Sequence, residues 1–132
     1  MSSDLFEQLR DDIKRGDAIA VRRFLEQGGD PNLHNACGET PLVIAAFDGQ
    51  THLAELLLVA GARIDHHVNG WTPLYSAAMN GHQKTVAALL EHGADIHIPM
   101  HGEPLTYWLN LVGHHKILEL IKAESRRLEG AA

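Results

Sequence analysis

The feature that most constrains the fold is an internal repeat of 32 residues. Residues 70–101 match residues 38–69 at this shift, and five groups of positions recur. They are Thr40-Pro41-Leu42 with Thr72-Pro73-Leu74, Ala45-Ala46 with Ala77-Ala78, Gly49 with Gly81, Leu57-Leu58 with Leu89-Leu90, and Gly61-Ala62 with Gly93-Ala94. A unit of this length cannot bury its apolar side alone, so neighbouring units must stack. The repeat therefore predicts an elongated solenoid.

The residue pattern of each unit predicts a helix, a tight turn, a second helix and an extended arm. Thr72 is a good N-cap because its hydroxyl oxygen can accept from a free backbone N–H at a helix start. Pro73 suits the first helical position, where its missing N–H costs nothing. Gly81 and Gly93 supply the left-handed residue that ends each helix. The second helix carries an apolar stripe at helical spacing, which predicts that it packs against its neighbours.

The two ends of the chain depart from the repeat and predict polar caps. Asp4 and Glu7 have the spacing of a capping box. The same helix has Leu5, Leu9 and Ile13 on one face. Near the other end, Thr-Pro-Leu has become Pro104-Leu105-Thr106. We therefore predict one domain, residues 1–132, made of an N-terminal cap at 4–37, full repeats at 38–69 and 70–101, and a C-terminal cap at 102–132.

The recurring residues resemble the ankyrin-repeat family, whose pattern is G-x-TPLH-x-AA-x-x-GH followed by LL-x-x-GA. The resemblance covers nearly the whole chain. It implies an all-α ankyrin-repeat solenoid with short β-hairpin-like arms, and a module that binds another protein. The TPLH histidine is replaced by Val43 and Tyr75, which removes a hydrogen bond worth about 1 kcal/mol at each site. The second arm is also one residue shorter than the first, so we expect its tip to project differently.

Composition excludes several classes of function. A formal net charge of −6 argues against a general nucleic-acid binder, which needs a basic face. No apolar run has membrane-spanning length, and the N-terminus lacks the features of a signal peptide. The single cysteine fits a reducing compartment. We expect a monomeric cytoplasmic protein, complete without another domain, that takes no cofactor and binds neither nucleic acid nor membranes.

The sequence offers little for catalysis. Cys37 has no neighbouring base that would activate it, and single carboxylates separated by whole repeats form no acid–base pair. We therefore predict no enzyme and no catalytic residue. Five of the ten histidines lie in the expected arms: His34, His66, His67, His97 and His101. Neighbouring arms that stand side by side could assemble a metal site, but no cysteine or carboxylate cluster joins these histidines. We predict no metal site and keep a histidine-arm metal-binding protein as an alternative.

The family resemblance implies that residues beside the arm glycines and at the end of each first helix line a concave face. Carried over by position, it gives the rows Glu39, Trp71, Glu103; Phe47, Met79, Leu111; and Asp48, Asn80, Val112. The arm-tip residues Ala36, Cys37, Val68, Asn69, Met100 and His101 extend this face. Trp71 is the residue we favour most, because tryptophan is over-represented among interface hot spots. The alternative is that Trp71 or Phe47 packs onto its neighbours and stiffens the arm.

Charge suggests the kind of partner. Between His34 and His115 there are seven acidic and two basic residues, which favours a partner protein with a basic or mixed-charge surface. An acidic surface that serves only solubility explains the same numbers. We predict a protein–protein interaction module that binds its partner on the concave face as a regulator, inhibitor or adaptor. A second hypothesis is an immunity protein that neutralises a toxin, such as a nuclease, by covering its basic cleft.

Overall fold

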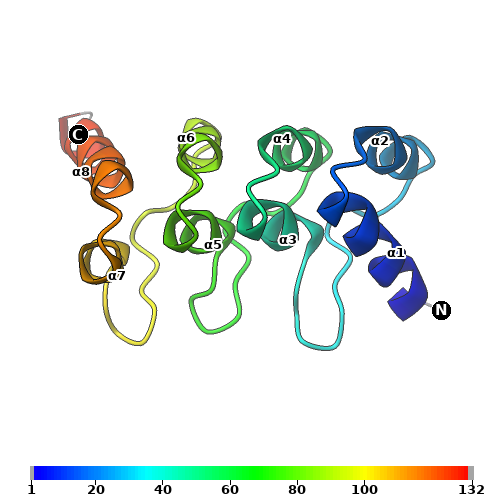
Figure 1. Ribbon diagram of the computed structural model, residues 1–132, viewed down its shortest axis with the longest axis horizontal. Helices are drawn as coiled ribbons and strands as arrows, with labels where there is room; N and C mark the ends of the chain where they lie inside the picture. Colours follow the sequence, from blue (N-terminus) through cyan, green and yellow to red (C-terminus); the bar gives the residue numbers. More distant parts are fainter. Residues whose placement is uncertain (1, 131–132) are drawn as a thin grey trace.

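Residues 2–130, which the computed structural model describes, form eight α-helices in four helix–turn–helix pairs (Figure 1). The helices are α1 (Ser2–Lys14), α2 (Ala18–Glu26), α3 (Pro41–Phe47), α4 (Thr51–Val59), α5 (Pro73–Met79), α6 (Gln83–Glu91), α7 (Leu105–Val112) and α8 (His115–Gly130). The odd-numbered helices form an inner row and the even-numbered helices an outer row, and each helix packs on the next one in its row. Three arms (residues 27–40, 60–72 and 92–104) connect the pairs and project beyond the inner row. Within the described range, no helix is both long and apolar enough to cross a bilayer.

The Thr-Pro start of each central inner helix behaves as the sequence predicts. Thr40 Oγ1 accepts from the backbone N–H of Val43 at 3.3 Å. Thr72 Oγ1 accepts from the backbone N–H of Tyr75 at 3.0 Å. In both helices proline follows the threonine directly, at a position where no intrahelical donor is needed. By contrast, α7 begins after Pro104 and has no side-chain hydrogen bond at its N-cap.

We expect Thr72→Ala to lower the free energy of unfolding by about 1 kcal/mol, because an N-cap hydroxyl satisfies a backbone N–H that no helical carbonyl can reach. Thr72→Ser keeps the hydroxyl and should recover most of this stability. Urea denaturation followed by circular dichroism measures both changes. Equal losses for the two variants would assign the effect to the buried methyl group instead of the cap.

The core lies between the two rows and between successive pairs. Each central inner helix contributes paired alanines that are fully buried, and their small size lets neighbouring inner helices approach closely. The outer helices contribute the larger apolar side chains of their inward stripe. The buried apolar core includes Phe6, Ile13, Val21, Leu42, Leu57, Leu74, Val86, Leu89, Leu109 and Ile121. Each helix pair therefore depends on its neighbours for burial, as a repeat of this length requires.

Two histidines connect successive pairs. His82 Nε2 lies 2.8 Å from the carbonyl oxygen of Phe47, and His114 Nε2 lies 3.1 Å from that of Met79. Each imidazole thus caps a free carbonyl at the end of the inner helix of the preceding pair, where no helical N–H is available. These two contacts give His82 and His114 a structural role in joining successive pairs.

The arms contain tight turns instead of β-hairpins. Among residues 2–130 there is no strand, and the only bridges are isolated ones, Val68 with Trp71 and Met100 with Glu103. The two residues between each bridged pair both have positive φ, +56° and +86° at Asn69-Gly70 and +51° and +77° at His101-Gly102. Positive φ at both central residues defines a type I′ turn. The expected hairpin-like arms are therefore not confirmed beyond these turns.

The first arm turns differently, as its extra residue predicts. Asn35 Oδ1 accepts from the backbone N–H of Cys37 and of Glu39, both at 3.0 Å. The side chain of Asn35 thus forms an Asx-type turn, in addition to the backbone bonds from Asn35 N–H to the Glu39 carbonyl at 3.2 Å and from Gly38 N–H to the Asn35 carbonyl at 3.0 Å. The tips of the first and second arms consequently have different backbone shapes.

The N-terminal helix corrects two expectations. Helix α1 begins at Ser2, so Asp4 lies inside the first turn and is not an N-cap. Leu5 is 49% exposed, whereas Phe6, Leu9 and Ile13 are buried. The i, i+3, i+7 spacing of these three residues places the large Phe6 ring on the buried face, and this rotates Leu5 toward solvent.

Candidate functional site

An open groove of about 390 Å³ lies where α1 and α3 meet the ends of the first two arms. Its lining residues are Arg10, Asp11 and Lys14 from α1, Val43, Ile44, Phe47 and Asp48 from α3 and its C-cap, Glu39 from the first arm and Trp71 from the second. We call it the inner groove. Its volume falls within the range of about 300–1,000 Å³ that is typical of ligand pockets. The structure thus brings together four residues that the sequence places on the binding face: Glu39, Phe47, Asp48 and Trp71.

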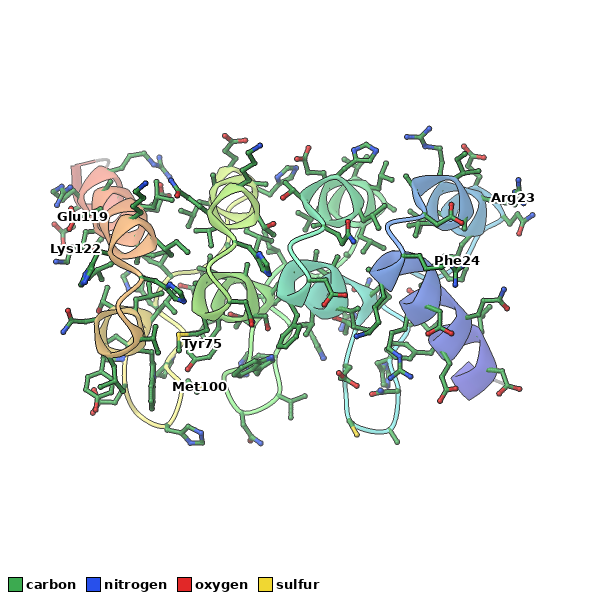
Figure 2. All side chains as sticks on the ribbon, in the orientation of Figure 1. Arg23, Phe24, Tyr75, Met100, Glu119 and Lys122 are labelled. Atoms are coloured by element: carbon green, nitrogen blue, oxygen red, sulfur yellow. The ribbon has the colours of Figure 1, made fainter. Side chains whose placement is uncertain are left out.

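Trp71 is held in a fixed position at the edge of this groove. Its ring centroid lies 4.8 Å from that of Tyr75 at an interplanar angle of 55°, an attractive tilted arrangement. Tyr75 lies on α5 close to the second arm (Figure 2). Burial raises the pKa of the Tyr75 hydroxyl above its usual value. Trp71 is partly buried, so it both packs onto the arm and contributes to the groove.

The apolar row along the inner helices is exposed to different degrees. Phe47 is 45% exposed and Leu111 is 64% exposed, but Met79 is partly buried against the core. Of the three, only Phe47 lines the inner groove. The remaining members of the predicted rows outside the groove are the exposed residues Asn80, Glu103 and Val112. Asn80 also donates from Nδ2 to the carbonyl oxygen of Ser76 at 2.7 Å, which ties it to its own helix.

The arm tips are exposed with one exception. Ala36, Cys37, Val68, Asn69 and His101 are exposed. Met100 is only 8% exposed and belongs to the core, which corrects its assignment as a binding residue. Its carbonyl oxygen accepts from Trp108 Nε1 at 3.1 Å. Met100 is the first residue of the type I′ turn in the third arm, and its side chain packs in the core.

The α1 residues of the groove were not identified as binding residues from the sequence, because the spacing between equivalent residues differs between the first repeat and the second. Gly16 precedes Gly49 by 33 residues, not 32, because the first arm is one residue longer. Counted back from these glycines, Lys14 occupies the position of Phe47. Alignment on the turn glycines, instead of on a constant shift, would therefore have placed Lys14 on the binding face. The same alignment places Arg10 and Asp11, one helical turn before Lys14, on the binding face as well.

The inner groove carries charges of both signs. Arg10 and Lys14 are on the α1 wall, and Glu39 and Asp48 are on the opposite wall, while Asp11 adds an acid on α1. Among the described residues, none of these five forms an ion pair. The ion pairs in that range are Arg15–Asp12, Lys122–Glu119 and Arg127–Glu124. Charges of both signs therefore remain available to a partner beside the Phe47 and Trp71 rings.

The arm histidines do not gather into a recognisable metal site. Within residues 2–130 there is no group of three or more His, Cys, Asp or Glu side chains placed to hold one ion. Individual arm residues have other hydrogen bonds. His67 Nδ1 accepts from the backbone N–H of Gly70 at 3.0 Å, and Asp65 Oδ1 accepts from that of Asp95 at 2.9 Å. These contacts stabilise the arms.

Known proteins share the pattern of this chain. A family model for ankyrin repeats, with three copies, matches residues 11–100. Relatives include potassium channel KOR1 of Oryza sativa subsp. japonica, 46% identical over 39% of this chain and 6% of its own length. Human ARF GTPase-activating protein GIT1 is 42% identical over 46% of this chain and 8% of its length, and bovine inactive serine/threonine-protein kinase TEX14 is 35% identical over 49% and 4%. The chain thus spans less than a tenth of each of these relatives. The family model covers well over half of the sequence, and the chain belongs to the ankyrin-repeat family.

Proposed function

We propose that this protein binds another protein on the inner-helix face, centred on the inner groove, and acts as a regulator, inhibitor or adaptor without catalysis. Ankyrin repeats are in general protein–protein interaction modules. The observation that carries the proposal for this chain is the inner groove, where exposed aromatic surface lies beside charges that have no ion-pair partner. Aromatic side chains in a groove supply binding energy, and surrounding charges supply specificity and association rate.

The partner surface that fits this groove has charges of both signs. A uniformly basic surface would meet Arg10 and Lys14 on the α1 wall, where like charges cost binding energy. A uniformly acidic surface would meet Glu39 and Asp48 on the other wall. The groove therefore favours a mixed-charge partner over the basic nuclease cleft of the immunity hypothesis, and no specific observation supports that second function.

The test compares partner capture by the wild-type protein and by four variants. Phe47→Ala and Trp71→Ala remove the two rings of the groove, while Ile19→Ala and Val59→Ala remove exposed apolar side chains from the outer row. A bound partner should lose at least tenfold in affinity with each groove variant, since truncation of a hot-spot aromatic residue costs about 2 kcal/mol or more. The outer-row variants should retain wild-type affinity.

Folding of each variant is checked by circular dichroism before binding is compared. Of the two groove variants, Phe47→Ala should disturb folding less, because the Phe47 side chain is half exposed and contributes little to the core. A partner that binds all five proteins equally would refute the groove as the binding site. A partner lost only with the outer-row variants would move the site to the opposite side of the molecule.

A further inference from the structure

A second, smaller pocket of about 150 Å³ lies between the first and second arms. It is lined by Cys37, Gly38, Glu39, Val43, His66, Val68 and Trp71, and we call it the arm pocket. It shares Glu39, Val43 and Trp71 with the inner groove, so the two hollows are neighbours. Pockets for drug-sized ligands are typically about 300–1,000 Å³. The arm pocket is therefore suited to a single side chain that enters beside a larger contact.

The walls of the arm pocket are held in place by contacts within the protein. His66 Nε2 lies 3.3 Å from the carbonyl oxygen of Gly38, which connects the second arm to the first. A Cβ atom on Gly38 would lie 2.6 Å from Val68 Cγ2, so glycine permits this close approach of the arms. The ring of Trp71 packs against Tyr75, and the backbone N–H of Trp71 donates to the carbonyl oxygen of Val68 at 3.1 Å. The pocket is consequently preformed, which reduces the entropy lost on binding.

The chemistry of the lining selects a basic group. Glu39 is the only acid among the lining residues, and neither lysine nor arginine lines the pocket. Glu39 Oε1 accepts one hydrogen bond, from Asn35 Nδ2 at 2.8 Å, and a carboxylate has lone pairs for several more. Trp71 adds an indole ring, and among the aromatic side chains tryptophan attracts cations to its ring face most strongly.

We propose that the arm pocket receives a lysine or arginine side chain of the partner protein, with Glu39 as its counter-ion and Trp71 as its aromatic wall. Val43 and Val68 are placed to contact the aliphatic stem, since long basic side chains bury their methylenes along apolar surface. Arg10 and Lys14 lie on the far wall of the neighbouring inner groove. They orient the partner, because its acidic groups are drawn toward α1 and its basic group toward the arm pocket. This inference rests on the proposed function.

The test uses peptides selected from a random-sequence display library on the immobilised wild-type protein. Selected peptides should share a basic residue. Replacement of that residue by a neutral analogue, norleucine for lysine or citrulline for arginine, should weaken binding about tenfold, as expected for a close interfacial charge pair. On the Glu39→Gln variant the same replacement should change affinity less than twofold. Glu55→Gln is the matched control, because Glu55 is an exposed acid on the outer helix α4 and lines neither the inner groove nor the arm pocket.

The outcomes separate this inference from the proposed function. Peptides that lose affinity with Phe47→Ala, but whose basic residue shows no coupling to Glu39, would overturn the arm-pocket assignment and leave the inner groove as the binding site. Peptides that bind Phe47→Ala and Trp71→Ala as well as wild type would overturn both. Failure of the library to yield any binder would also count against both, since a preformed groove should select ligands.

Discussion

Gly70→Ala is expected to lower the free energy of unfolding by about 3 kcal/mol or more, against about 1–2 kcal/mol for Gly102→Ala. The two glycines occupy the same position in successive type I′ turns, with φ of +86° and +77°. The cost of placing an L-residue in the left-handed region is therefore similar at both. The difference comes from the surroundings, which make Gly70 the more demanding site.

A Cβ atom on Gly70 would lie 2.4 Å from the carbonyl oxygen of Pro99 and 3.0 Å from Met100 Cα. These are backbone atoms of the third arm and cannot rotate away as a flexible side chain can. At Gly102 no atom lies within 4 Å of the added methyl group. Gly70→Ala must therefore separate the second and third arms or leave the clash in place.

Urea denaturation of the two variants and the wild type measures this difference. The fluorescence of Trp71, next to Gly70, should also change in Gly70→Ala and not in Gly102→Ala. Equal loss of stability in the two variants would mean that the arms can part without cost. In that case the close packing of the second arm on the third would contribute nothing to folding.

Leu57→Ala is expected to destabilise the protein by about 2–5 kcal/mol, the usual range for a buried leucine. Leu57 on α4 is 0% exposed, whereas Val59, two residues later on the same helix, is 83% exposed. Val59→Ala should change stability by less than about 0.5 kcal/mol. The pair thus compares buried and exposed aliphatic truncation within one helix.

The position of Leu57 in the stack makes its loss spread beyond α4. Helix α4 contacts α2 and α6 as well as α3, and in a solenoid each unit is stabilised mainly through its neighbours. Hydrogen exchange of the Leu57→Ala variant should therefore show faster opening in α2 and α6 as well. Faster exchange confined to α4 would show that the pairs open independently.

The helices could be predicted from sequence because their causes are local. A threonine followed by proline sets a helix start, and a glycine sets its end. Thr40, Thr72, Gly49 and Gly81 act in this way in the structure. The paired alanines and the spacing of the leucines then determine which side is buried. Each of these positions depends on only a few neighbouring residues, so their identity was sufficient.

The site was harder to predict because it depends on how separate segments meet. Met100 has the same repeat position as Val68, yet Met100 is buried and Val68 is exposed. The indole N–H of Trp108 donates to the Met100 carbonyl, and the earlier repeats have Ser76 and Ile44 at the position of Trp108. Lys14 lines the inner groove, but because the first arm is one residue longer, a shift of 32 residues aligns Arg15 instead of Lys14 with Phe47. Neither effect can be found from a constant repeat shift. The partner-binding residues and the domain boundaries stay predictions.

The histidine bridges have a consequence for how such a chain can grow. The imidazole that donates lies at the start of one outer helix, and the carbonyl that accepts lies at the end of the inner helix of the preceding pair. A duplicated segment of 32 residues would therefore carry both halves of the bond. If such a segment were inserted in tandem, its imidazole would bond to the pair before it, and its carbonyl would accept from the pair after it. These are the same contacts that join α6 to α3 and α8 to α5 in the structure. Lengthening the array by whole units therefore requires no new interface.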